Sequence, residues 1–193
     1  MANSFKLLAL RVFPDCDASI KKCLQAGVFY YFYNDYVIKE GGKVIERSCK
    51  YNEPLSSNFF HIGEGANGTT INLQAVVGMN GDGKSSLVEI ALRLVNNFSI
   101  SRHIHSDDHK PLAANNVSAE LYYINDDTFY CLSEQNGDIE DMKLWKYKLE
   151  GNQDIRSSEV PDNDLSKVFF YSLVSNYSHY SYNTIERIIV YVV

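Results

Sequence analysis

Residues 78–86 combine the residue types that bind phosphate groups, at a spacing that brings them together. They read Gly-Met-Asn-Gly-Asp-Gly-Lys-Ser-Ser and match the pattern G-x-x-x-x-G-K-[ST] without a mismatch. Glycines let the backbone curl, so that successive N–H groups can point at one anion. Lys84 would place a positive charge on the β- and γ-phosphates, and the Ser85 hydroxyl is placed to bind Mg²⁺. The expected ligands of a nucleotide are Gly78, Asn80, Gly81, Asp82, Gly83, Lys84, Ser85 and Ser86.

Such a loop needs a buried strand before it and a helix after it. Residues 71–77 end in small apolar side chains, which predicts a strand that enters a sheet. Residues 86–95 carry apolar side chains at helical spacing, and Glu89 and Arg93 can pair on the opposite face. We expect Asn96 and Asn97 to end this helix. The alternative is a glycine-rich turn that matches the pattern by chance, which the surrounding strand and helix patterns disfavour.

The residues inside this phosphate-binding pattern narrow the class of protein further. The form G-x-N-G-x-G-K-S-S resembles the Walker A loop of the ATP-binding-cassette class of P-loop ATPases. This class includes transporter, RecF-like recombination and chromosome-maintenance ATPases, and the ATPases related to nucleases of the overcoming-lysogenization-defect type. The resemblance covers about residues 71–95 and implies an α/β fold, with a P-loop NTPase core and a flanking antiparallel β subdomain. Asp82 departs from the family, where small residues are commoner, and an acid beside phosphates weakens binding unless it points outward.

The resemblance also implies parts that this sequence does not show. The Leu-Ser-Glu-Gln run at 132–135 lacks the glycines of the family signature, and residues 186–193 have only the apolar part of a Walker B strand. A chance apolar strand is the alternative for 186–193. No catalytic residue can be assigned, so we expect an incomplete cassette-type ATPase that binds ATP and Mg²⁺. ATP hydrolysis would then need a C-terminal half or a partner, such as a second copy in a homodimer.

A second class of function stays open beside this one. The chain can be a nucleotide-responsive interaction module that binds ATP without turnover, because the hydrolytic parts are missing. A GTPase or kinase would need an Asn-Lys-x-Asp motif or a cluster of lid arginines, and neither is visible.

Three further groups of residues are weaker candidates. The resemblance implies a glutamine near Mg²⁺ after a strand at 167–174; here Asn176 is the candidate substitute, and a turn rich in Tyr and Ser is the alternative. The resemblance also implies that an aromatic residue of the early β region stacks on adenine; the candidates are Tyr51, Phe59 and Phe60, and packing in the core or on the surface is the favoured alternative for each. The run from His103 to His109 could hold a metal, although a solvated loop is favoured because no further ligands follow.

Composition sets the limits of these predictions. The 193 residues fit one domain, and 45% hydrophobic with 22% charged residues describe a soluble globular protein. A net charge of −6 argues against DNA binding by this chain, except through a larger assembly, and against a role on membranes. The four cysteines form neither a zinc pattern nor a disulfide framework. They indicate reduced thiols and a cytoplasmic protein.

We divide the single domain at 1–193 into four parts. They are an antiparallel β region at 1–70, the strand, loop and helix at 71–98, a flexible loop at 99–116, and a β-rich region at 117–193. The two β regions are expected to join. Strands are predicted at 5–13, 28–33, 36–39, 43–45, 117–124, 128–132, 143–149 and 167–174, and a loop at 150–164. A short helix is predicted through Gln25, with Asp17 or Ser19 as its cap.

Overall fold

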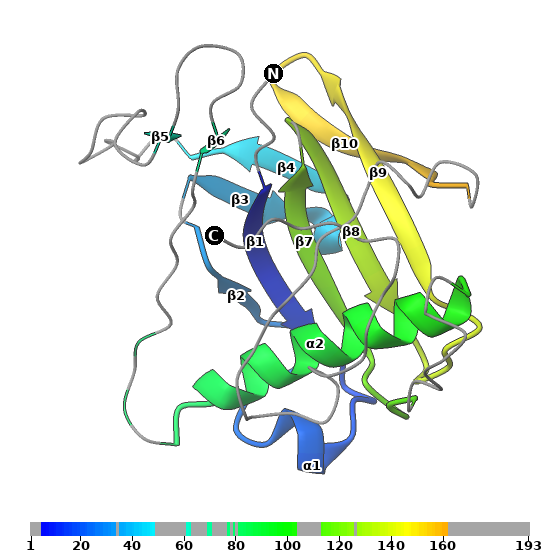
Figure 1. Ribbon diagram of the computed structural model, residues 1–193. Coiled ribbons are helices and arrows are strands. Elements are labelled where there is room, and N and C mark those ends of the chain that lie inside the picture. The colour runs from blue at the N-terminus through cyan, green and yellow to red at the C-terminus, as the bar shows by residue number, and fades with distance from the viewer. Residues whose placement is uncertain are drawn as a thin grey trace.

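The main feature of the protein is one eight-stranded sheet in which every neighbouring pair is antiparallel (Figure 1). The computed structural model describes residues 5–33, 35–48, 61–62, 69–70, 77, 79, 81–103, 113–125 and 127–161. The strand order is β2-β1-β7-β8-β9-β10-β4-β3. The strands are β1 (Phe5–Val12), β2 (Phe29–Tyr31), β3 (Tyr36–Lys39), β4 (Val44–Arg47), β7 (Ala119–Asn125), β8 (Thr128–Glu134), β9 (Lys143–Glu150) and β10 (Gln153–Glu159).

The remaining described elements are few. Two helices, α1 (Ala18–Lys21) and α2 (Lys84–Ser101), accompany the sheet, and a 3-10 turn, η1 (Glu40–Gly42), joins β3 to β4. A separate two-stranded ladder pairs β5 (His61–Ile62) with β6 (Thr69–Thr70).

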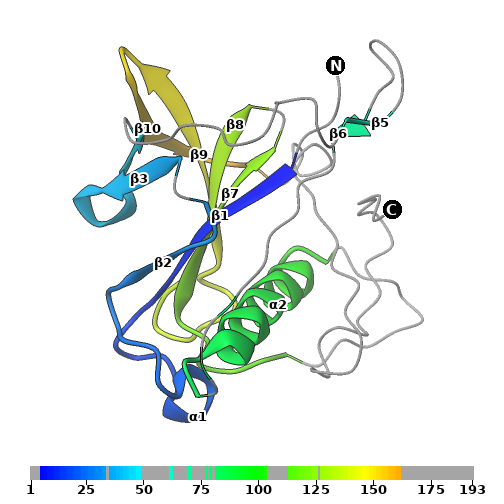
Figure 2. The ribbon, with the colours of Figure 1, turned by 90° about the vertical axis from the view of Figure 1, so that its left-hand side faces the viewer.

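The sheet curls until it forms a nearly closed barrel (Figures 1 and 2). Its two edge strands are β2 and β3, and a side chain links them: the backbone N–H of Ile38 donates to the Tyr31 hydroxyl oxygen over 3.0 Å. A register shift after Leu7 in β1 turns both Leu8 and Ala9 into the interior, so a bulge contributes to the curvature.

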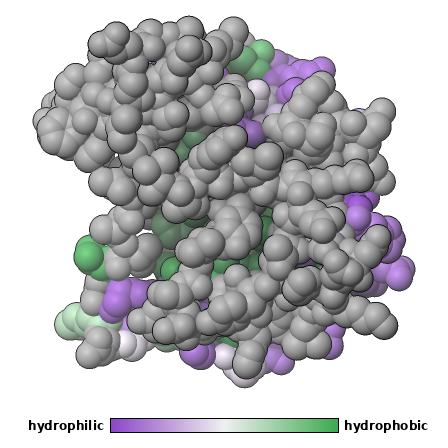
Figure 3. Space-filling model, viewed as in Figure 1, coloured by the Kyte–Doolittle hydropathy of each residue, from purple (hydrophilic) through white to green (hydrophobic). Residues whose placement is uncertain are grey.

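Helix α2 covers the outer face of this sheet, as Figure 2 shows. Its buried stripe of Leu87, Ile90, Leu94 and Phe98 joins one core cluster with strand residues such as Leu121. The inner face holds a second cluster. Strand β7 is therefore buried on both faces, which explains its nearly continuous apolar and aromatic sequence. In the space-filling view of Figure 3, described hydrophilic residues lie along the right-hand edge and hydrophobic ones toward the centre.

The predicted α/β fold is wrong. A P-loop NTPase core is built on parallel strands, whereas the described sheet is antiparallel throughout. The resemblance to cassette-type P-loop ATPases, drawn from the loop at 78–86 and its Walker A pattern, is contradicted with it. The physical reason is that the connections after β7, β8 and β9 make consecutive hairpins, and hairpins produce antiparallel pairs. The predicted strand at 71–77 lies outside the described residues apart from Val77.

Most of the shorter predictions hold. Strands near 5–13, 28–33, 36–39, 43–45, 117–124, 128–132 and 143–149 are present, and Asp17 caps α1. The two β regions do join, because β1 pairs with β7 and β4 with β10. Two predictions are wrong: α2 continues through Asn96 and Asn97 to Ser101, and the expected loop at 150–164 contains β10. The strands predicted at 167–174 and 186–193 lie outside the described residues.

Candidate functional site

The glycine-rich loop leads directly into the N-terminus of α2. Gly81 and Gly83 have φ values of 95° and 89°, in the region that glycine adopts without strain. Gly83 is the N-cap of α2, no side chain caps the helix there, and the first turn contains no acidic residue. A helix N-terminus carries a partial positive charge and N–H groups that point outward. The first turn therefore presents a favourable electrostatic environment to an anion.

The loop rests on the turn that follows α1. The Cys23 thiol donates to the Gly81 carbonyl oxygen over 2.8 Å. A Cβ atom on Gly83 would lie 2.7 Å from Leu24 Cδ2 and 3.1 Å from Cys23 Sγ. Glycine is thus required at 83 by both its backbone angle and its close packing. Sequence reasoning gave Cys23 no role near the loop, and nothing in its spacing from other cysteines could have revealed this contact.

The two charged side chains of the loop both bind the backbone of Met79. Lys84 Nζ donates to the Met79 carbonyl oxygen over 2.6 Å, and Asp82 Oδ2 accepts from the Met79 N–H over 2.6 Å. The Asp82 N–H also donates to the Met79 carbonyl over 3.3 Å. The carboxylate of Asp82 is therefore turned into the loop instead of outward.

The structure describes six of the eight predicted loop residues together. Ser85 is exposed in the first turn of α2, whereas Ser86 is buried with an exposed fraction of 3%. Gly78 and Asn80, together with Asn176, Tyr51, Phe59 and Phe60, lie outside the described residues. Of the histidine run only His103 is described, at the end of α2. Across the described parts of the chain, no three His, Cys, Asp or Glu side chains gather closely enough to hold a metal ion.

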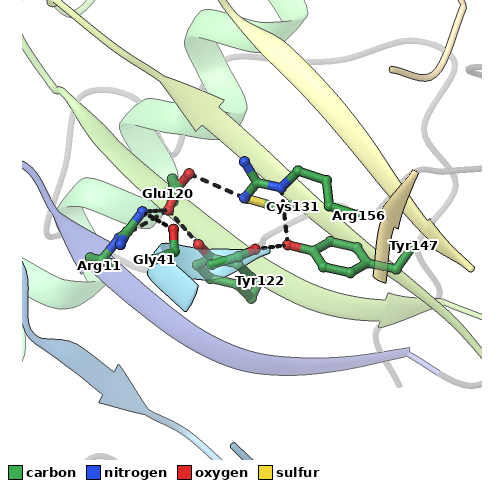
Figure 4. A network of polar contacts seen from close by, with 8 residues as sticks. Arg11, Gly41, Glu120, Tyr122, Cys131, Tyr147 and Arg156 are labelled. Atoms are coloured by element: carbon green, nitrogen blue, oxygen red, sulfur yellow. Dashed lines mark hydrogen bonds and ion pairs between the residues drawn. The ribbon is translucent and has the colours of Figure 1, made fainter. Parts of the chain in front are cut away.

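A second polar group of residues lies inside the curled sheet, and sequence reasoning missed it (Figure 4). Glu120 of β7 has no exposed surface. Its Oε2 accepts from Arg11 Nε over 3.0 Å and Arg11 Nη2 over 2.5 Å, and Arg156 Nη2 donates to its Oε1 over 3.3 Å. The Tyr122 hydroxyl also donates to Oε2. We call these residues, with Tyr147 and Cys131, the Glu120 network.

Arg11 and Tyr147 extend the Glu120 network to η1. Arg11 Nη2 donates to the Gly41 carbonyl over 2.7 Å, and the Tyr147 hydroxyl donates to the Gly42 carbonyl. Arg156 Nε donates to the Tyr147 hydroxyl over 3.3 Å. Burial raises the pKa of the Tyr147 hydroxyl, so it remains a protonated donor.

The Glu120 network is arranged to hold strands together. Both carboxylate oxygens of Glu120 accept hydrogen bonds from two cations that come from β1 and β10. Pairing and hydrogen bonds compensate a buried charge for its lost hydration, so removing one partner is costly. The signal that could have revealed it is a lone glutamate inside the apolar run 117–124.

A third polar contact fixes α2 and the residues before β7. Asn97 is fully buried; its Nδ2 donates to the Ala114 carbonyl over 2.7 Å and to Glu134 Oε2 over 2.8 Å, and its Oδ1 accepts from the Ala114 N–H over 2.9 Å. Burial raises the pKa of Glu134. The side-chain amide of Asn97 thus both donates to and accepts from the backbone of Ala114, as the backbone of a neighbouring strand would.

The fold and the loop together define a mainly β protein, in which an antiparallel, nearly closed sheet carries one long helix that begins at a glycine-rich loop. No protein-family model, no curated protein and no solved structure matches this chain. Among the helices of the described residues, none has the length and apolar character needed to cross a membrane.

Proposed function

We propose that this protein is a nucleotide-responsive module that binds the phosphate chain of magnesium-complexed ATP at residues 78–86. The observation that supports the proposal most directly is the placement of Lys84 and two positive-φ glycines at the uncapped N-terminus of α2. The proposal does not require the parallel core of a P-loop ATPase, because the anion-binding groups belong to the loop and the helix.

Different residues of the loop and of α2 would contact the phosphates and the Mg²⁺ ion. The N–H groups of the first turn of α2 and the partial charge of the helix would face the phosphates. Lys84 would exchange the Met79 carbonyl for a phosphate oxygen, and the exposed Ser85 hydroxyl would contact Mg²⁺. Helix α2 is anchored on the sheet through Leu87 and Ile90, so its N-terminus is held in a fixed position. Turnover is not part of the proposal.

Replacing Lys84 tests the proposal. We expect Lys84→Ala to weaken the binding of Mg-ATP by at least about tenfold, because a charged hydrogen bond to a phosphate is worth roughly 1.5–3 kcal/mol. The measurement is calorimetric titration of Mg-ATP and Mg-GTP into the full chain, which also reports the base preference.

Lys148→Ala is the matched control. Lys148 is an exposed lysine on β9, so the control removes the same charge away from the loop. If Lys84→Ala bound Mg-ATP as tightly as Lys148→Ala, or if the parent chain bound no nucleotide, the proposal would be wrong.

A further inference from the structure

Helix α2 is buried on the side that faces away from the sheet as well as on the side that contacts it. Ile90 and Leu94 belong to the core cluster that α2 shares with the sheet. Leu92, Asn96 and Ser99 are nevertheless only 8%, 2% and 2% exposed. Successive helix residues are about 100° apart around the axis, so Leu92 points nearly opposite to Leu94. We call Leu92, Asn96 and Ser99 the second face of α2.

The described elements do not explain the burial of Leu92. Among them, α1, β7 and β8 contact α2 most closely, and the apolar side chains of β7 and β8 join the cluster that contains Leu94. Leu92 belongs to neither of the two hydrophobic clusters that the described residues form. A leucine loses its exposed surface only where other atoms cover it. The second face therefore needs a partner that is not one of these elements.

The described part of the chain ends beside the C-terminal end of α2. Arg102, the C-cap of α2, donates from Nη2 to Glu159 Oε1 over 3.3 Å, and Val160 belongs to the same core cluster as Phe98. The sequence continues with residues 162–193, which lie outside the described residues. The segment that follows Pro161 thus starts next to the last turn of α2.

We infer that residues 167–174 dock on the second face of α2 and run antiparallel to the helix, so that α2 is the middle one of three layers. The segment reads Lys-Val-Phe-Phe-Tyr-Ser-Leu-Val, which is the apolar and aromatic composition of a chain segment that is covered by others. The inference concerns a packing surface inside the protein. It does not depend on nucleotide binding.

The direction and the length of the segment fit this face. Because the chain leaves the described region at the C-terminal end of α2, the segment would pass Ser99 first and Leu92 later. The 18 residues of α2 make a helix about 27 Å long, and eight extended residues span about 26 Å. One pass of residues 167–174 therefore covers the helix from end to end.

Three other segments outside the described residues fit less well. Residues 104–112, directly after α2, are mainly polar, and residues 71–76, before the loop, include Asn72 and Gln74 and no aromatic side chain. Both would supply less apolar area to the second face. Residues 186–193 are apolar, but they come so long after Pro161 that the exit of the chain does not place them.

Disulfide formation in the full chain tests the inference. Ser99→Cys is combined with Val168→Cys, and Leu92→Cys with Ser172→Cys. The matched controls are the swapped combinations, Ser99→Cys with Ser172→Cys and Leu92→Cys with Val168→Cys. Each protein is treated with a mild oxidant at low protein concentration. Mass spectrometry identifies the disulfides and distinguishes them from those of the native cysteines.

We expect the first two combinations to form a disulfide within one chain at least about fivefold faster than the swapped ones. The reason is geometric: a disulfide needs Cα atoms within about 7 Å of each other, and Leu92 and Ser99 are about 10 Å apart along the helix. Each variant is first checked for the circular dichroism spectrum of the parent.

The competing segments are tested in the same way. Leu73→Cys represents residues 71–76 and Val190→Cys represents residues 186–193, each combined with Leu92→Cys. A faster disulfide in either of these proteins than between positions 92 and 172 would overturn the inference. So would equal rates in all four original combinations, no disulfide in any of them, or a disulfide that joins two chains, which would place a second copy on this face.

A double-mutant cycle gives a second test that does not depend on oxidation. If Leu92 and Phe170 are in contact, the double variant Leu92→Ala with Phe170→Ala should lower the urea midpoint by at least about a quarter less than the sum of the single variants. Ile38→Ala replaces Phe170→Ala in the control, because Ile38 belongs to the inner cluster and its effect should add to that of Leu92→Ala. Additive losses for Leu92 and Phe170 as well would contradict the inference.

Discussion

At the scale of single residues, Gly42 shows how closely the interior of the sheet is packed. Its φ is 98°, and a Cβ atom built on it would lie 2.0 Å from the Tyr122 hydroxyl oxygen. Tyr122 has no exposed surface and donates its hydroxyl hydrogen to Glu120, so it has no room to move away. Gly42 is therefore required by its backbone angle and by contact with the Glu120 network.

Alanine substitutions at Gly42 and Gly151 separate the effect of the backbone angle from the effect of the contact with Tyr122. Gly151 also has a positive φ, 66°, but a Cβ atom there would meet nothing within 4 Å. We expect Gly151→Ala to lower the free energy of unfolding by about 1 kcal/mol through backbone strain. Gly42→Ala should cost roughly 1–3 kcal/mol more because of overpacking.

Urea denaturation of the two variants and the parent, followed by circular dichroism, gives the comparison. Equal losses for Gly42→Ala and Gly151→Ala would show that the contact with Tyr122 contributes nothing.

The sequence identified the loop residues but not the Glu120 network, and the difference is one of distance along the chain. Residues 78–86 are consecutive, so their shared chemistry can be recognised from the sequence itself. Arg11 and Glu120 are separated by 109 positions and meet only because β1 pairs with β7. The lone glutamate in the apolar run 117–124 indicates a buried charge, but no local pattern identifies its partners.

At the scale of elements, the length of α2 is decided by its burial. Asparagine is a poor helix former and its side chain competes for backbone hydrogen bonds, which is why the helix was expected to end at 96–97. In the structure Asn97 instead bonds the peptide group of Ala114 and the carboxylate of Glu134, so a tertiary contact overrides the local preference. A single sequence does not reveal that contact, since Ala114 lies 17 positions away.

Removing the Asn97 amide should therefore be costly. We expect Asn97→Ala to lower the free energy of unfolding by about 2–4 kcal/mol, because the buried N–H and carbonyl of Ala114 and one oxygen of Glu134 lose a partner. The loss is measured as a shift in the midpoint of denaturation.

Val88→Ala is the control on the same helix. Val88 is 37% exposed, and a substitution on that face should change stability by no more than about 0.5 kcal/mol. A loss in Asn97→Ala as small as that in Val88→Ala would contradict the role given to the amide.

Strand β10 shows the opposite error, a strand predicted as a loop. Its sequence is polar because much of it is exposed, and only Ile155 is a large apolar residue. The turn at Gly151, with its positive φ, was the available hairpin signal. The strand is placed by pairing with β9 and β4 on its two sides, which is a property of the sheet and not of the segment.

At the scale of the whole molecule, the Glu120 network connects strands from both ends of the described sequence. Arg11 belongs to β1, Glu120 to β7 and Arg156 to β10, and their contacts reach η1 between β3 and β4. Strand β10 is four strands away from β1 in the sheet order. Contacts across the interior therefore hold the curled sheet in its nearly closed form.

Breaking this network should destabilise the protein more than breaking a surface ion pair. We expect Glu120→Ala to cost about 3–5 kcal/mol of unfolding free energy, because two cations, only 13% and 16% exposed, lose their partner. Lys39→Ala breaks the pair with Glu46, in which Lys39 is 51% exposed, and should cost about 0–1 kcal/mol.

Thermal and urea denaturation of these two variants checks the difference. A Glu120→Ala protein no less stable than Lys39→Ala would mean that closure of the sheet does not depend on the network.

The fold class is the prediction from sequence that differs most from the structure. Individual strands could be predicted from alternation and from turns, and most of those predictions hold. The arrangement could not, because a glycine-rich loop before an amphipathic helix was taken to define the whole core. Here that helix lies across an antiparallel sheet, and the loop is attached to a different architecture.

The pairing of β1 with β7 also bears on how the chain folds as it is synthesised. β1 can pair with β2 early and β4 with β3, but their second partners, β7 and β10, come much later in the chain, as the 107-residue separation of Gln153 and Glu46 shows. Distant pairings of this kind form slowly, and a strand edge that waits for its partner can associate with other chains. During translation, β1 and β4 therefore each keep one unpaired edge until β7 and β10 have been made.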